Sequence, residues 1–120
     1  MIRIKRVYDP PESDDGPRFL VDRLWPRGVK REALPMDAWL KDVAPSEVLR
    51  RQFHHDPARW DEFRHAYAAE LDGKPEAWRP ILKTARWGNV TLLYSARDKE
   101  HNNAAVLKAY VEERLRGEAK

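Results

Sequence analysis

The sequence has 120 residues, of which 42% are hydrophobic and 36% are charged, and it contains no cysteine. This length and balance predict one soluble globular domain over residues 1–120, large enough to bury a core. The missing cysteines exclude disulfides, thiol nucleophiles, thiolate zinc sites and iron–sulfur clusters. No apolar run approaches the roughly 20 residues that span a bilayer, and residues 1–6 lack the apolar stretch of a signal peptide, so we expect a cytoplasmic protein without a membrane partner.

Charge is unevenly distributed along the chain, although the net charge is only +3. Residues 1–31 carry eight Lys/Arg against five Asp/Glu, residues 73–120 carry ten against six, and the middle is net acidic. If the two ends come together in the fold, they form a modest basic face that attracts anions. The alternative is a solvated surface that is simply rich in arginine.

The first part of the chain has the pattern of two strands. Alternating apolar and basic residues predict a strand over residues 2–8. Three prolines and four acids make residues 9–17 a loop. A near-continuous apolar run over residues 18–25 predicts a strand that is covered on both faces, and Pro26 ends it.

The middle of the chain connects these strands to the helices. Residues 27–35 form a connecting segment, with one helical turn near residues 30–34. Residues 38–43 lie between two prolines that leave little room for a helix, so we assign a short strand there. Ser46 is a favourable N-cap for a helix that runs to about residue 53.

Three further helices are marked by apolar stripes. Asp56 is placed as the N-cap of a helix that Gly73 ends; the next begins near Pro75, with Gly88 as its stop, and Gly117 marks the end of the last. The inward stripes are Trp60, Phe63, Tyr67 and Leu71; Trp78, Ile81, Leu82 and Ala85; and Ala104, Leu107, Val111 and Leu115.

The pattern as a whole predicts an α/β fold. Residues 89–95 form a second buried strand between the last two helices. We expect a single-domain layer sandwich with a small, mostly parallel sheet flanked by helices. Ligands of such folds bind outside the carboxyl ends of the strands, where loops and helix N-termini converge. Residues 22–28 and residues 94–103, which follow the two buried strands, are therefore candidate walls of a site.

The first candidate wall concentrates charge where a strand ends. Arg23 and Arg27 carry guanidinium groups that bind carboxylates or phosphates in a bidentate manner, and Asp22 can orient one of them. Trp25 lies between the two arginines, and Gly28 allows close approach of the backbone to a ligand. An alternative stays open, in which Asp22 only neutralises an arginine in a structural salt bridge.

The second candidate wall places polar groups between a strand and a helix. Its candidate ligand-binding residues are Tyr94, Ser95, Asp98, His101 and Asn102. Asp98, Asn102 or Asn103 can cap the last helix, whose free N–H groups favour a bound anion. Ser95 as nucleophile and His101 as general base are a further idea, but no Gly-x-Ser-x-Gly elbow supports it.

Metal and coenzyme sites are not expected. His54, His55 and Asp56 are adjacent instead of spaced as in His-Glu-x-x-His, and they are better explained by a helix C-terminus followed by an N-cap. No glycine-rich loop of the dinucleotide or P-loop type occurs, so we predict no bound nucleotide coenzyme.

Several stretches of the sequence resemble one family. They are Arg6-Val7-Tyr8-Asp9, Asp22-Arg23-Leu24-Trp25-Pro26-Arg27-Gly28, Trp39-Leu40-Lys41-Asp42-Val43-Ala44-Pro45-Ser46, Phe53-His54-His55-Asp56-Pro57 and Leu93-Tyr94-Ser95-Ala96 followed by His101-Asn102. In this order, over nearly the full length, they resemble the YeaO-like branch of the family called domain of unknown function 488. The resemblance implies an α/β fold with polar motif residues near strand ends, and it implies no particular activity. The wider family often has a Cys-His-Arg stretch where this chain reads His101-Asn102-Asn103, so a thiol-dependent activity does not transfer.

Three hypotheses for the function follow. The first is a site that binds a small anion through a phosphate or carboxylate group, with catalysis left open. The second is a nucleic-acid-binding module that uses the basic chain ends, and such binding weakens steeply with salt. Its candidate residues are Arg3, Lys5, Arg6, Arg18, Lys30 and Arg31. The third is a partner-binding protein without chemistry, which an exposed apolar patch in place of a polar cleft would favour.

Overall fold

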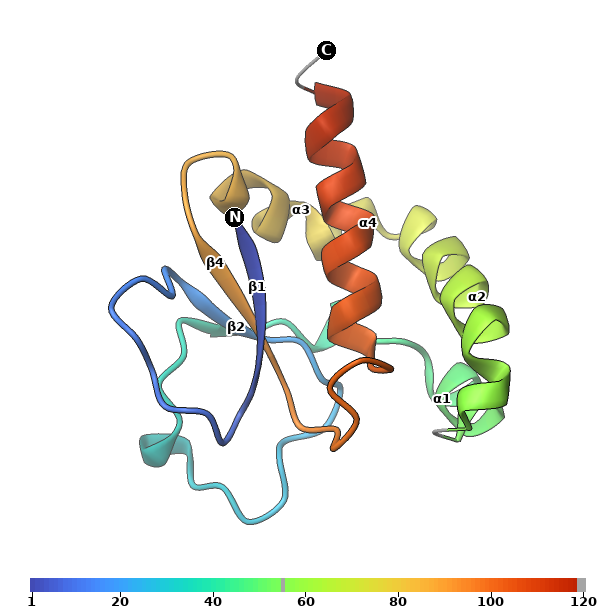
Figure 1. The fold of residues 1–120 in the computed structure, drawn as a ribbon, viewed down its shortest axis with the longest axis horizontal. Helices are drawn as coiled ribbons and strands as arrows, with labels where there is room; N and C mark the ends of the chain where they lie inside the picture. The colour runs from blue at the N-terminus through green and yellow to red at the C-terminus, as the bar shows by residue number, and fades with distance from the viewer. Residues whose placement is uncertain (55, 119–120) are drawn as a thin grey trace.

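In the described part of the chain, the sheet has four parallel strands. The computed structural model describes residues 1–54 and 56–118. The strands are β1 (Ile2–Arg6), β2 (Arg18–Leu20), β3 (Ala38–Trp39) and β4 (Val90–Tyr94), in the spatial order β1-β4-β2-β3. The predicted α/β fold with a small parallel sheet is therefore confirmed. The strand that comes last in the sequence, β4, lies between β1 and β2 (Figure 1).

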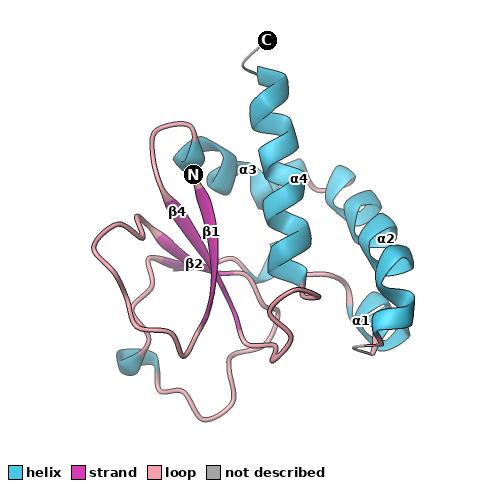
Figure 2. Cartoon of the chain, viewed as in Figure 1, coloured by secondary structure: helices cyan, strands magenta, loops and turns pink. Residues whose placement is uncertain are grey.

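The α-helices of the described residues lie on one side of this sheet (Figure 2). They are α1 (Glu47–Phe53), α2 (Trp60–Asp72), α3 (Pro75–Ala85) and α4 (Asn103–Glu118). All of them contribute to one apolar cluster with strand residues such as Leu92. On the opposite face, Leu20 and Leu93 pack against Leu34 from the connection between β2 and β3. The helices flank only one face because prolines and a glycine keep that connection from forming more than a short 3-10 turn (Arg31–Ala33).

The strand predicted over residues 18–25 is wrong in its second half. β2 ends at Leu20, although the N–H of Val21 still donates to the Leu93 carbonyl at 3.0 Å. Beyond this point the chain leaves the sheet, and Leu24 is 63% exposed. The apolar run continues past the strand because the residues after it line the sheet edge instead of its faces.

The strand predicted over residues 38–43 is also shorter than expected. Only Ala38–Trp39 pairs with β2, and a 3-10 turn (Lys41–Val43) takes most of the remainder. β3 is an edge strand, so it has a partner on one side only. The chain turns there toward the helical side, where Val43 is fully buried.

Two helical segments begin at the N-cap residues that the sequence predicted, Ser46 and Asp56. The Ser46 hydroxyl accepts a backbone N–H of α1 at 3.2 Å, and the Asp56 carboxylate accepts one at 3.0 Å. The first turn after Asp56 is a 3-10 turn (Pro57–Arg59) that leads into α2. His54 is the C-cap of α1, with φ of 44°. His55, which we placed with it at the helix end, lies outside the described residues.

The two glycine stops predicted for the later helices are wrong, whereas Gly73 is the C-cap of α2 as expected. α3 ends at Ala85, before Gly88 is reached, and Arg86 is its C-cap. Gly117 lies inside α4, which continues to Glu118. The Glu118 carboxylate pairs with the Arg86 guanidinium, and this contact favours the extra residues of helix.

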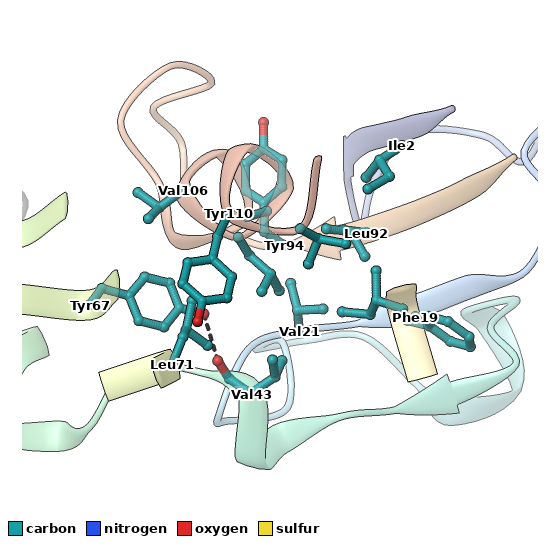
Figure 3. Close-up of a cluster of buried hydrophobic side chains, with 14 of the residues drawn as sticks. Ile2, Phe19, Val21, Val43, Tyr67, Leu71, Leu92, Tyr94, Val106 and Tyr110 are labelled. Atoms are coloured by element: carbon teal, nitrogen blue, oxygen red, sulfur yellow. Dashed lines mark hydrogen bonds between the residues drawn. The ribbon is translucent and has the colours of Figure 1, made fainter. Parts of the chain in front are cut away.

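A buried hydrogen bond fixes the segment between β3 and α1. Tyr67 is fully buried, and its hydroxyl donates to the Val43 carbonyl at 2.5 Å (Figure 3). Burial raises the pKa of Tyr67 well above its ordinary value, so the hydroxyl stays a donor. One turn further along α2, Glu70 accepts the Ser46 N–H at 2.9 Å and the Ser46 hydroxyl at 2.5 Å. The position of α1 at the sheet edge is thus set by α2.

Candidate functional site

A cavity of about 490 Å³ lies at the carboxyl edge of the sheet, where β2 and β4 end. This volume is typical of sites that hold small molecules. Six of the ten predicted site residues line it: Asp22, Arg23, Trp25, Arg27, Ser95 and Asn102. The two segments that the sequence singled out therefore meet at one cavity, together with residues of α1 and α2 that the sequence did not point to.

Asp22 ties the two segments together. Its Oδ2 accepts the backbone N–H of Ser95 at 2.9 Å and the Ser95 hydroxyl at 2.8 Å. A second link runs from the Asn103 side-chain amide to the Val21 carbonyl at 3.0 Å. Burial raises the pKa of the Asp22 carboxyl, and the hydrogen bonds from Ser95 oppose that rise. The loop after β4 is thereby fixed against the loop after β2.

Four arginines line the cavity, two from each side. Arg23 and Arg27 follow β2, whereas Arg50 and Arg51 belong to α1. Among the described lining residues, carboxylates come only from Asp22 and Glu47. The lining therefore carries an excess of positive charge.

These arginines differ in how far they are engaged. The Arg23 Nε donates to the Pro45 carbonyl at 3.3 Å, and Arg51 pairs with Glu47 at 2.7 Å. Within residues 1–54 and 56–118, no hydrogen bond or ion pair engages the guanidinium groups of Arg27 and Arg50.

The salt-bridge alternative for Asp22 is not what the structure contains. Asp22 is bonded to Ser95, and it forms an ion pair with neither Arg23 nor Arg27 in the described part of the chain. The two arginines are therefore not neutralised by the neighbouring carboxylate.

The ring of Trp25 is fixed by a hydrogen bond and by contacts with Trp39 and Arg31. Its Nε1 donates to the Val29 carbonyl at 2.5 Å, and its ring meets Trp39 edge to face with centroids 5.4 Å apart. The Arg31 guanidinium lies over both rings, at 5.0 and 5.4 Å from their centroids. The Nε1 of Trp39 donates to the Asp22 carbonyl at 2.7 Å, so these contacts also fix the start of the loop.

Four predicted site residues do not line the cavity: Gly28, Tyr94, Asp98 and His101. Tyr94 is 2% exposed within the core. Gly28 has φ of 77°, a left-handed conformation that favours glycine, so its role is in the turn. His101 Nδ1 lies 2.9 Å from Asp98 Oδ2, and the imidazole ring packs on Trp60 with centroids 4.9 Å apart.

Ser95 and His101 do not form a nucleophile and base pair. The Ser95 hydroxyl donates to Asp22, whereas the His101 ring is engaged with Asp98. The backbone N–H of His101 holds the pKa of the Asp98 carboxyl below its ordinary value. Asp98 thus closes the turn, and Asn102 caps α4 by accepting a backbone N–H at 2.8 Å.

The contribution of α1 was missed by the sequence analysis. Ser46 marked where this helix begins, but no local signal shows which part of the fold its arginines face. The missing information is the contact of Ser46 with Glu70, which lies 24 positions along the chain. A pair of adjacent arginines, Arg50 and Arg51, in a helix next to a predicted sheet edge was the one available hint.

The basic residues near the start of the chain are largely neutralised by an acidic loop. Arg3 pairs with Asp14 at 2.7 Å, and Asp15 pairs with Lys5 at 3.0 Å and with Arg18 at 2.5 Å. These three cations therefore do not form the open basic face that the nucleic-acid hypothesis requires.

Residues 1–54 and 56–118 contain neither a cluster of metal-ligating side chains nor a helix that could span a membrane. There, no three histidine, aspartate or glutamate side chains come together as metal ligands would. No helix in the same range has the length and apolar content needed to cross a membrane.

Comparisons with known proteins give consistent matches. The family model described as "Inactive DUF488-N3 subclade" matches residues 1–120. The uncharacterized protein YeaO of Escherichia coli (strain K12) is 45% identical over 106 residues, which cover 88% of this chain and 92% of YeaO. The uncharacterized protein Rv3073c of Mycobacterium tuberculosis (strain ATCC 25618 / H37Rv) is 41% identical over 106 residues, covering 88% of this chain and 89% of that protein. No solved structure matches the chain.

Proposed function

We propose that this chain, which belongs to the inactive DUF488-N3 subclade, binds a small molecule through a phosphate or carboxylate group and does not transform it. The observation that carries the proposal is the set of four arginines around a cavity of about 490 Å³. Guanidinium groups bind such oxyanions with paired, charge-assisted hydrogen bonds.

The partners of the charged lining residues support an anion as the ligand. Asp22 is hydrogen-bonded to Ser95 and Glu47 is paired with Arg51, so neither carboxylate forms an ion pair with Arg27 or Arg50 in the described part of the chain, although the charge of Arg50 acts to lower the pKa of the Asp22 carboxyl. These two arginines come from different walls of the cavity, one from the loop after β2 and one from α1. An anion between them would accept hydrogen bonds from both sides.

Two observations favour binding without catalysis. The family description itself contains the word inactive. In addition, the Ser95 hydroxyl donates to Asp22 and the His101 ring is engaged with Asp98, so these two residues do not form a Ser–His pair. The partner-binding hypothesis gains no support, because this edge of the sheet has a charged cavity in place of an apolar patch.

Titration calorimetry with inorganic phosphate and with acetate tests the proposal. We expect binding to the unaltered chain at low salt, and about tenfold weaker binding after Arg27→Ala or Arg50→Ala, because each change removes charge-assisted hydrogen bonds. Both variants should remain folded, since neither guanidinium takes part in a hydrogen bond or ion pair with the described residues.

Arg64→Ala is the matched control. Arg64 is exposed on α2, pairs with Asp61 at 2.9 Å and does not line the cavity. The control removes the same charge, so it should leave the affinity nearly unchanged. Equal weakening by the control, or phosphate binding that survives the Arg27→Ala, Arg50→Ala double change, would reject the proposed site.

A further inference from the structure

The cavity has room for more than an anionic group. Its volume of about 490 Å³ falls within the range of roughly 300–1,000 Å³ found for sites that enclose whole small molecules. A bare phosphate ion between Arg27 and Arg50 would leave the apolar part of the lining in contact with water. The ligand is therefore expected to have a body that covers this part.

Three aromatic rings contribute to the apolar lining. Trp25, Phe53 and Phe63 come from three different elements and all line the cavity. The rings of Phe53 and Phe63 are stacked, with centroids 4.4 Å apart and planes inclined by 26°. Trp60 packs against both at 5.7 Å, and Trp25 is held by its own hydrogen bond. Phe53 and Phe63 are only 6% and 4% exposed, so the half-buried Trp25 offers the most accessible ring of the three, and packing fixes all of them in place.

Leu24 adds an apolar group that solvent can reach. It lines the cavity between Arg23 and Trp25, and it is 63% exposed. A single exposed leucine is common on protein surfaces. Here, however, it stands beside arginines that would hold an anion, so a ligand bound there would cover it.

Resting on the proposed anion site, we infer that the ligand is an aromatic anion, in which a planar ring or nucleobase is joined to the phosphate or carboxylate. Ring-shaped ligands suit this lining for two reasons. Aromatic side chains make favourable stacked or edge-to-face contacts with other rings. A rigid ring also loses less conformational freedom on binding than a flexible chain of similar area.

Four phosphate compounds separate the contributions of the anion and the ring. Calorimetry would compare inorganic phosphate, ribose 5-phosphate, phenyl phosphate and adenosine monophosphate on the full chain. We expect phenyl phosphate and adenosine monophosphate to bind at least about tenfold more tightly than ribose 5-phosphate, because burying an aromatic ring contributes that much. Tighter binding of adenosine monophosphate than of phenyl phosphate would identify a nucleobase as the better ring.

A substitution at exposed Leu24 tests whether the aromatic ring of the ligand binds next to this residue. Leu24→Ser should weaken phenyl phosphate binding about threefold and leave inorganic phosphate unchanged, since it removes apolar contact only. Val48→Ser is the control, because Val48 is 65% exposed on α1 and does not line the cavity. Both residues are largely exposed, so both variants should fold.

The outcomes distinguish this inference from the proposed function. Similar affinities for inorganic phosphate, ribose 5-phosphate and phenyl phosphate would overturn the aromatic ligand and leave the anion site in place. Equal effects of Leu24→Ser and Val48→Ser would likewise overturn the assignment of the ring contact. Failure of all four phosphates to bind would overturn both proposals.

Discussion

Two groups of cationic side chains in this molecule have opposite surroundings. In the ion cluster, formed by Arg3, Lys5, Arg18 and Asp15, the cations surround one carboxylate that is 1% exposed. In the arginine pocket, formed by Arg23, Arg27, Arg50 and Arg51, the guanidinium groups surround a cavity. The comparison shows that residue type does not decide the role. The difference is that the chain supplies Asp15 to the ion cluster, whereas no carboxylate of the described residues pairs with Arg27 or Arg50.

The loop between β1 and β2 supplies that partner. Burial alone would raise the pKa of Asp15, but the Glu12 backbone N–H and the Lys5 ammonium bring the pKa below its ordinary value. The main chain of the same residue is also engaged, since the Thr91 hydroxyl donates to the Asp15 carbonyl at 2.8 Å. The ion cluster therefore stabilises the fold, and each of its cations pairs with a carboxylate.

Breaking the ion cluster should have the largest effect on stability. Asp15→Ala leaves buried Arg18 without its carboxylate, and we expect a loss of about 4 kcal/mol in the free energy of unfolding. Urea unfolding measures the loss, and the phosphate affinity of the folded protein should not change. Asp14→Ala is the control, because Asp14 is exposed and pairs with Arg3 alone. A loss no larger than that of the control would contradict the structural role of the cluster.

Breaking the contact between the loop after β2 and the loop after β4 should have the next largest effect on stability. Asp22→Ala leaves the Ser95 N–H and hydroxyl without their acceptor, which should cost about 2 kcal/mol. Asp22→Asn keeps an acceptor oxygen and should cost less. In a double-mutant cycle with Ser95→Ala, urea unfolding should give a coupling energy of about 1 kcal/mol. If the losses in stability of the two single variants simply add in the double variant, the Asp22–Ser95 contact does not join these two loops.

The pH dependence of stability distinguishes the two carboxylates by sign. The lowered pKa of Asp15 favours the folded state above the ordinary value of about 4, and this stability is lost as the pH falls through the folded pKa. The raised pKa of Asp22 acts in the opposite sense. Its contribution to the stability of the folded state is present when the pH is below the ordinary pKa of an aspartate, and it is lost as the pH rises through the folded pKa.

Urea unfolding over a pH series checks these signs. Asp15→Asn should flatten the loss of stability in acid, whereas Asp22→Asn should make it steeper, because it removes an opposing contribution. The same change in slope for both variants would contradict the assigned directions.

Loosening the loop of the arginine pocket should have the smallest effect. Arg31→Ala removes the guanidinium that lies over Trp25 and Trp39, and we expect a loss of about 0.5–1 kcal/mol by urea unfolding. Phosphate affinity should fall about twofold, because the loop that carries Arg23 and Arg27 is less well fixed. Lys30→Ala removes a neighbouring exposed charge and should change neither quantity. Identical behaviour of the two variants would show that the rings do not hold the loop.

Local patterns predicted the parts of the fold that depend on local contacts. Ser46 and Asp56 cap helices because capping involves only the next few residues. The buried strand β4 follows from a continuous apolar run, and the inward face of α2 follows from apolar residues at helical spacing. The resemblance to the YeaO-like branch, drawn from short motifs, is also confirmed.

Features that depend on distant contacts could not be predicted. The strand over residues 18–25 looked continuous because apolar side chains line both the sheet and the edge beyond it. The contact of Asp22 with Ser95 agrees with the rule that the carboxyl ends of parallel strands lie at one edge of the sheet. The position of Arg50 at this edge depends instead on the hydrogen bond between Ser46 of the α1 N-terminus and Glu70 of α2. The two walls that follow β2 and β4 could therefore be anticipated from the sequence, and the wall from α1 could not.

The strand order also sets when the sheet can assemble. β1 and β2 do not pair with each other, and both take β4 as a neighbour, although β4 is reached only after three of the helices. During synthesis, the edge of β1 therefore stays unpaired until residues 90–94, which form its partner strand β4, have been made. Such long-range pairing slows folding and leaves unpaired edges exposed in the nascent chain. The acidic loop that covers Arg3 and Lys5 can engage these cations as soon as it is made, so it can shield their charge during this interval.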